Sequence, residues 1–128
     1  MNSRASIKLL VVDDNPGVRK VIRNLLASVA REICECGDGA GVLTLFRRER
    51  PDFVLMDIQM EGVNGIIATR QIKAADPTAR IIIVTDYDQA DLREAAYQAG
   101  ACGYVLKENL LDLVEVLNEF VEKERSSP

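Results

Sequence analysis

Carboxylates, one hydroxyl and one lysine stand at the ends of several apolar segments of this chain. Asp13 and Asp14 follow one apolar run, Asp57 follows a second, and Thr85 and Lys107 close two more. Carboxylate oxygens are the ligands that hard cations such as Mg²⁺ prefer, and a carboxylate can also attack phosphorus as a nucleophile. If the fold gathers these side chains, they can hold Mg²⁺ and accept a phosphoryl group.

The elements that would position these side chains follow a regular alternation along the chain. Short apolar runs predict strands at 7–12, 32–36, 52–56, 80–85 and 102–107. Helical spacing predicts helices from 16 to 29, up to 50, at 66–75, at 89–98 and at 110–121. Such alternation is typical of an α/β domain with a parallel sheet, whose strands end at one common edge. Because neighbouring strands lie about 4.8 Å apart, carboxylates at this edge can share one ion.

The first helix shows the pattern most clearly. Asn15 is a good N-cap and Pro16 suits the first turn. The apolar residues that follow predict a single stripe, at Val18, Val21, Ile22, Leu25, Leu26 and Val29.

Taken singly, the polar residues have ordinary interpretations: an aspartate as turn former or helix cap, Thr85 as a strand residue, Lys107 as a solvated charge. Their joint placement at successive strand ends favours a common site. Three carboxylates would be balanced by one Mg²⁺ and the lysine, and an ion with open positions can receive a phosphoryl group.

Composition limits the other functions. The 128 residues suit one domain, with 48% apolar residues and a net charge of −4 that does not favour nucleic-acid binding. Histidine is absent, which excludes Ser-His-Asp and Cys-His catalysis and imidazole-bound zinc.

No run is long enough to span a membrane and no signal peptide is visible, so we expect a cytoplasmic protein with reduced thiols. Cys34 and Cys36 are interpreted as small strand residues, with half of a metal site as the alternative.

Four segments together resemble a known family. "VVDDNP", "VLMDIQMEGVNG", "IIIVTDY" and "GACGYVLKENL" are similar to the motifs of the response-regulator receiver domain of two-component signalling, over about 7–120. The ending "GYVLKENL" resembles the LuxR/NarL type. The resemblance implies a flavodoxin-like, doubly wound, five-stranded parallel sheet of order 2-1-3-4-5 with five helices.

The same resemblance assigns roles to residues. Asp57 would accept a phosphoryl group from the phosphohistidine of a histidine kinase or phosphotransfer protein. Asp14 and Asp57 would bind Mg²⁺ through carboxylates, Asp13 mainly through water, and Gln59 through its backbone carbonyl. Lys107 would pair with Asp57 and then with the phosphoryl group.

Two further residues would form a switch. The Thr85 hydroxyl would move to the phosphoryl group, and Tyr104 would follow from an outward to an inward rotamer. The alternative for Tyr104 is a half-buried strand aromatic.

Three positions depart from the family pattern. Glu61 and Glu108 stand where the family commonly has proline, and the bond before Glu108 is either cis or trans. Asp86 adds a carboxylate after Thr85. We hypothesise that Glu61 and Asp86 slow attack on phosphodonors or favour Mg²⁺.

The sequence thus predicts a signalling switch over 1–124, with a tail or linker at 125–128, that is not a turnover enzyme on a separate substrate. An aspartate-nucleophile phosphatase is disfavoured because the first two carboxylates are adjacent. A receiver used only for binding is the other alternative.

Leu111 and Val116 widen the apolar face of the last helix, for core packing or for a homodimer contact. We expect an excised N-terminal receiver whose output domain, such as a DNA-binding domain, controls transcription.

Overall fold

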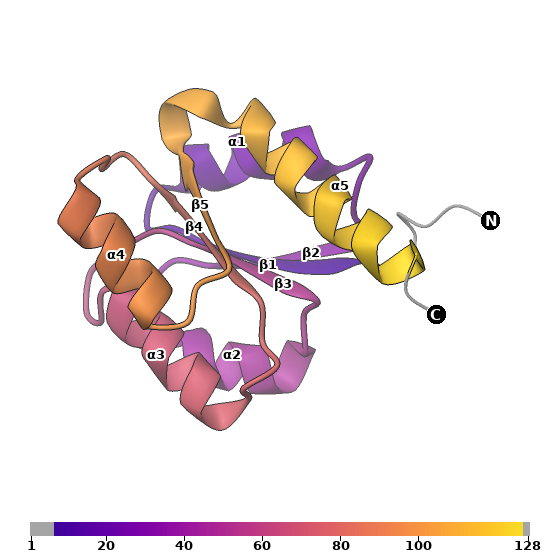
Figure 1. Ribbon diagram of the computed structural model, residues 1–128. Helices are drawn as coiled ribbons and strands as arrows, with labels where there is room; N and C mark the ends of the chain where they lie inside the picture. The colour runs from indigo at the N-terminus through magenta and orange to yellow at the C-terminus, as the bar shows by residue number, and fades with distance from the viewer. Residues whose placement is uncertain (1–6, 127–128) are drawn as a thin grey trace.

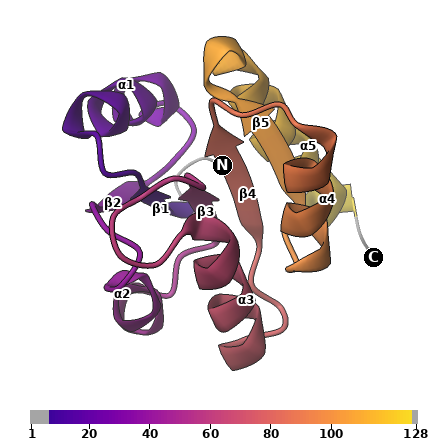
Figure 2. The same ribbon diagram turned by 90° about the vertical axis from the view of Figure 1, so that its left-hand side faces the viewer.

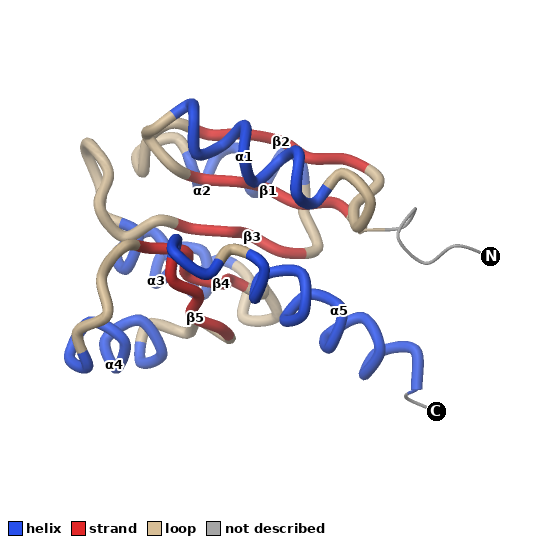
Figure 3. The backbone as a smooth tube through the Cα atoms, turned by 90° about the horizontal axis from the view of Figure 1, so that it is seen from above, coloured by secondary structure: helices blue, strands red, loops and turns tan. Residues whose placement is uncertain are grey.

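The computed structural model describes residues 7–126 and shows one parallel sheet between two layers of helices (Figure 1). The five strands lie side by side in the order β2-β1-β3-β4-β5 (Figure 3). Along the chain the elements are β1 (Lys8–Val12), α1 (Pro16–Leu26), β2 (Glu32–Cys36), α2 (Val42–Glu49), β3 (Phe53–Met56), α3 (Gly65–Ala75), β4 (Ile81–Thr85), α4 (Ala90–Gln98), β5 (Gly103–Leu106), η2 (Lys107–Asn109) and α5 (Leu111–Ser126). The predicted fold class and strand order are confirmed.

Two separate apolar clusters hold the layers together. One face of the sheet packs against α2, α3 and α4, and the other packs against α1 and α5 (Figure 2). In β1, Leu10 belongs to the first cluster, whereas Leu9 and Val11 belong to the second. Because both faces are covered, the central strands are continuously apolar, as parallel strands usually are.

The start of α1 follows the prediction. The Asn15 side chain accepts hydrogen bonds from the backbone N–H groups of Gly17 and Val18, which satisfies two donors that a helix start leaves unpaired. Asn15 therefore fixes the point at which the chain turns from β1 into α1.

The predicted stripe of α1 is wrong at Val21, which is 53% exposed. Ile22 and Leu26 define the buried direction of α1, and one position along a helix turns the side chain by about 100°. Val29 is buried, but it lies in the turn after the helix.

The two apolar residues predicted to widen the face of the last helix, Leu111 and Val116, differ in burial. Val116 is partly buried and packs against the second cluster, as in the core interpretation, whereas Leu111 is 73% exposed. The α5 helix continues through Ser126, and residues 127–128 of the predicted tail lie outside the described part of the chain. The described chain has no cis peptide bond, so the bond between Lys107 and Glu108 is trans.

Candidate acidic site at the sheet edge

The carboxyl ends of β1, β3 and β5 meet in a small polar hollow. Asp13 and Asp14 follow β1, Asp57 follows β3, and Lys107 follows β5. The hollow has a volume of about 280 Å³ and is lined by Asp13, Asp14, Asn15, Asp57, Gln59, Asp86, Tyr87 and Lys107. The structure brings the three carboxylates and the lysine together at this edge, as the sequence predicted.

Lys107 lies between two buried carboxylates. Its Nζ is 2.7 Å from Asp13 Oδ2 and 3.2 Å from Asp57 Oδ2. The other oxygen of Asp13 accepts a hydrogen bond from the backbone N–H of Asn15 at 2.9 Å. Both oxygens of Asp13 therefore already have partners, whereas the Asp14 side chain is exposed.

Burial dominates the electrostatics of Asp57. Its side chain is only 6% exposed, and this desolvation raises the pKa of the carboxyl, with the charge of Asp13 adding to the effect and Lys107 opposing it. For Lys107, burial lowers the pKa, but the hydrogen bond to Asp13 and the charges of both aspartates outweigh burial, so its pKa is raised. The lysine therefore stays charged and compensates the aspartates.

The donor set fits a hard divalent cation. One oxygen from each of Asp13, Asp14 and Asp57 lies within 4.8 Å of the others. All three are carboxylate oxygens, with no sulfur or imidazole donor in the group, which is the chemistry that Mg²⁺ or Ca²⁺ prefers.

The backbone around Asp57 is fixed from both sides. Its N–H donates to the carbonyl oxygen of Val12 at 2.9 Å, so β1 and β3 stay in register up to the site. A Cβ added to Gly65 would lie 1.9 Å from the carbonyl oxygen of Asp57. Only glycine lets the start of α3 come this close to the end of β3.

Thr85 and Tyr104 lie beside the hollow and do not line it. Thr85 is fully buried, and its hydroxyl is 3.4 Å from the backbone nitrogen of Tyr87, a long hydrogen bond. The Tyr104 hydroxyl donates to the carbonyl oxygen of Tyr87 at 2.7 Å, and its ring is half-buried beside Tyr97 and under the Arg93 guanidinium.

Two residues that line the hollow lay outside the predicted site: Asn15, predicted only as a helix cap, and Tyr87, which sequence reasoning missed altogether. Tyr87 lines the hollow, and its hydroxyl donates to the side-chain oxygen of Gln59, so it bridges the loops that follow β3 and β4. Its position two residues beyond a strand that ends at the site was the available signal. Of the two extra acids, Asp86 lines the hollow, whereas Glu61 does not.

The contacts of Cys34 and Cys36 disfavour the alternative that they form half of a metal site. Glu32, Cys34 and Glu49 do form a cluster, but the Lys8 ammonium supplies its positive charge, 2.9 Å from Glu49 and 3.7 Å from Glu32. Burial raises the pKa of the Cys34 thiol, which disfavours the thiolate that a metal needs. Cys36 donates to a backbone carbonyl instead.

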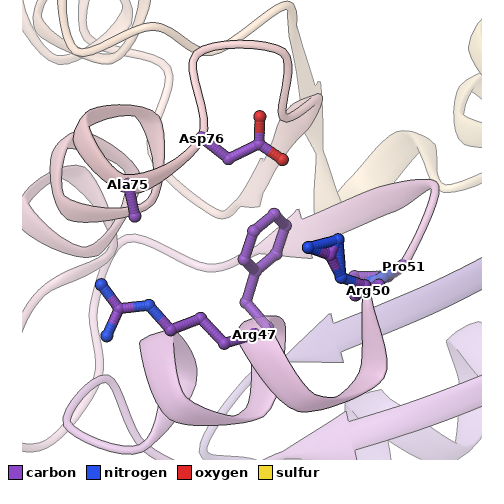
Figure 4. A pocket seen from close by; sticks show the side chains of 6 residues that line it. Arg47, Arg50, Pro51, Ala75 and Asp76 are labelled. Atoms are coloured by element: carbon purple, nitrogen blue, oxygen red, sulfur yellow. The ribbon is translucent and has the colours of Figure 1, made fainter.

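A larger hollow of about 670 Å³ lies between the ends of α2 and α3 (Figure 4). Its polar groups have local explanations. Asp76 accepts hydrogen bonds from the backbone and hydroxyl of Thr78, while Arg47 and Arg50 stand at the end of α2, where positive charge suits the helix dipole.

Comparison with known proteins agrees with this geometry. The model of the response regulator receiver domain family matches residues 9–118, and the chain belongs to that family. Over 93% of its length it is 34% identical to the response regulator GacA of Pseudomonas aeruginosa, and over 85% it is 33% identical to the nitrate/nitrite response regulator NarP of Escherichia coli. The chain spans only about half of these regulators, 57% and 52% of their lengths.

A solved structure gives the same result. A two-component response regulator of the LuxR family from Aurantimonas superposes with a TM-score of 0.84 at 33% identity, covering 91% of this chain and 86% of the other. The protein is a receiver domain of two-component response regulators, and its relatives include regulators of the LuxR and nitrate/nitrite kind. No described helix is long and apolar enough to cross a membrane.

Proposed function

We propose that Asp57 accepts a phosphoryl group from the phosphohistidine of a sensor histidine kinase or a phosphotransfer protein. The observation that carries this proposal is the placement of the Lys107 ammonium against the buried Asp57 carboxylate, which lines the acidic hollow. An Asp57 oxygen forms the bond to phosphorus while the bond from phosphorus to the imidazole nitrogen breaks. The bond's electron pair stays on the imidazole, which carries a proton on its other ring nitrogen and therefore leaves as a neutral ring, and Lys107 stabilises the charge on the transferred group.

Asp14 and Asp57 would hold Mg²⁺ through their carboxylates, with the backbone carbonyl of Gln59 as a further ligand. Asp13 would act through water, because both of its oxygens already accept hydrogen bonds. Bound there, Mg²⁺ would neutralise charge that develops on the phosphoryl oxygens. The fit rests on the all-oxygen donor set.

Phosphorylation would act as a switch. Among the described residues, the Thr85 hydroxyl is held by one long contact, so it would turn toward a phosphoryl group, and Tyr104 would leave its hydrogen bond to the Tyr87 carbonyl. The changed face would bind a partner or a second copy of the chain and control an output domain that regulates transcription. Such a protein works in the cytoplasm and turns over no separate substrate.

Intact-mass measurement tests this directly. Wild type and Asp57→Asn are incubated with Mg²⁺ and acetyl phosphate. We expect wild type alone to gain one phosphoryl group. If both proteins stay unmodified, also with a histidine phosphotransfer protein as donor, Asp57 is not a phosphoacceptor and the domain acts by binding alone.

A further inference from the structure

Arg19 of α1 ties the acidic turn to the edge strand of the sheet. Its Nη1 donates to the backbone carbonyl oxygen of Asp13 at 2.6 Å, and its Nε donates to Glu35 Oε1 of β2 at 2.9 Å. The Arg19 side chain is only 19% exposed. Its guanidinium is therefore fixed between the main chain of the site and a carboxylate outside the site.

The contact between Arg19 and Asp13 is made to the peptide group. The Asp13 carboxylate has other partners, the Asn15 N–H and Lys107. A peptide group is planar, so an arginine that fixes the Asp13 carbonyl also fixes the N–H and Cα of Asp14. Within the described residues the Asp14 side chain makes no hydrogen bond or ion pair, so its backbone decides where its carboxylate can reach.

Glu35 in turn is held firmly. Its second oxygen accepts a hydrogen bond from Arg23 Nε at 2.7 Å. The bonds from Arg23 and Arg19 hold the pKa of Glu35 below its usual range, so the carboxylate that anchors Arg19 stays ionised. Arg23 also donates to the Ile33 carbonyl of β2 at 2.9 Å.

We propose that Arg19 is a positioning residue for the cation site, and that it acts through the peptide between Asp13 and Asp14. The inference rests on the proposed function, since it concerns the same Mg²⁺ site. Outer partners that orient metal ligands commonly change metal affinity by about 10- to 100-fold.

If Arg19 acted only through its charge, its loss would change the Mg²⁺ affinity in the opposite direction to the loss of a positioning residue. The positive charge of Arg19 lies close to a site for a divalent cation, so removal of the charge alone would tighten Mg²⁺ binding. Loss of positioning would weaken binding even when the charge is kept. Arg19→Lys separates the two effects, because it retains the charge and loses the fork that reaches both Asp13 and Glu35.

The experiment is Mg²⁺ titration by calorimetry of wild type, Arg19→Lys, Arg23→Lys and Glu35→Gln, with urea unfolding of each. Arg23 is the matched control: it bonds the same Glu35 and the same strand but does not touch Asp13. We expect Arg19→Lys to weaken Mg²⁺ binding about tenfold, Glu35→Gln to weaken it by a smaller factor, and Arg23→Lys to stay within twofold of wild type.

Unchanged affinity in Arg19→Lys, or equal losses in Arg19→Lys and Arg23→Lys, would overturn the inference, because the arginines would then only join α1 to β2. If Arg19→Lys does not fold, Glu35→Gln takes its place. Weaker Mg²⁺ binding in Glu35→Gln than in Arg23→Lys would support the inference, and equal affinities would overturn it. Absence of Mg²⁺ binding by wild type would instead remove the proposed cation site, and this inference with it.

Discussion

The hydroxyl of Tyr104 donates a hydrogen bond to the backbone carbonyl oxygen of Tyr87, 2.7 Å away. Tyr104 belongs to β5, whereas Tyr87 lies in the loop after β4 and reaches over the acidic hollow to Gln59. Burial raises the pKa of Tyr104, so the hydroxyl remains a donor at neutral pH. One hydrogen bond thus connects the aromatic face at β5 with a wall of the acidic site.

Replacement of Tyr104 by phenylalanine should therefore loosen the Tyr87 loop. A neutral, partly buried hydrogen bond contributes about 0.5–1.5 kcal/mol, and we expect that loss in the free energy of unfolding by urea. Tyr97→Phe is the control, since Tyr97 packs beside the Tyr104 ring but is exposed. Equal stability of the two variants would show that the bond to Tyr87 contributes nothing.

Lys107→Met should leave two buried carboxylates without their cation. Loss of one partner from a buried ion pair costs about 3–5 kcal/mol, and partial solvent access at this site reduces the cost to about 2–3 kcal/mol. Saturating Mg²⁺ should restore much of the loss, because a ligand at 100 times its Kd stabilises by about 2.7 kcal/mol. Urea unfolding with Mg²⁺ or with a chelator measures both effects. The exposed control Lys20→Met should match wild type, both with Mg²⁺ and with the chelator.

Gly65→Ala should damage the site although glycine has no functional group. The added Cβ would meet the Asp57 carbonyl oxygen at 1.9 Å, so α3 or the end of β3 must shift. Overpacking typically costs about 1–3 kcal/mol, and we expect a loss of this size together with slower phosphorylation by acetyl phosphate. At Gly41 the nearest atom would be 3.4 Å away, so Gly41→Ala should remain within about 1 kcal/mol of wild type. Similar losses at both positions would contradict this account.

The pair of Lys8 and Glu49 makes stability depend on pH in acid. Hydrogen bonds from Lys8, then from Arg48 and Cys34, lower the pKa of Glu49 to about 2. A carboxyl with a lowered folded-state pKa stabilises the protein above its unfolded pKa of about 4.3, and this contribution disappears as pH falls toward 2. Glu49→Gln should thus destabilise the protein at pH 6 but much less at pH 2.5, as urea unfolding can measure. Glu119→Gln should be neutral at both, since exposed Glu119 forms no ion pair in the described chain. A pH-independent deficit in Glu49→Gln would refute the pair as the cause.

Asp86 should tune the site through its charge. It lines the acidic hollow, so Asp86→Asn should weaken Mg²⁺ binding and speed modification by the anionic donor acetyl phosphate. A screened charge at this range contributes about 0.5–1 kcal/mol, which corresponds to a two- to fivefold change. Glu61 lies outside the hollow lining, and Glu61→Gln should have the smaller effect. If neither variant, nor both together, changes the affinity or the rate, the charges of Glu61 and Asp86 have no such role.

The sequence predicted those features that depend on neighbours along the chain. Asn15 caps α1 through groups two and three residues away, and apolar runs ending in Asp13 and Asp57 mark strands that end at the site. The features that were missed depend on distance in space. The hydrogen bond between Tyr87 and Gln59 joins residues 28 positions apart in the sequence, and the one between Arg19 and Glu35 joins residues 16 apart. No local sequence pattern predicts either contact. Val21 fits the helical stripe of α1, but only the packed fold shows that no neighbouring element of the described chain covers this position.

The bond from Arg23 to the Ile33 carbonyl also bears on how the protein behaves at high concentration. Ile33 belongs to β2, which borders the sheet on one side and could template strand addition from another molecule. The arginine occupies a backbone acceptor that an incoming strand would need, and charged Glu32 and Glu35 stand on the same strand. The edge of the sheet at β2 is thereby protected against edge-to-edge aggregation, so a second molecule cannot readily add a strand there while the acidic site at the carboxyl ends of the strands stays accessible to small ligands.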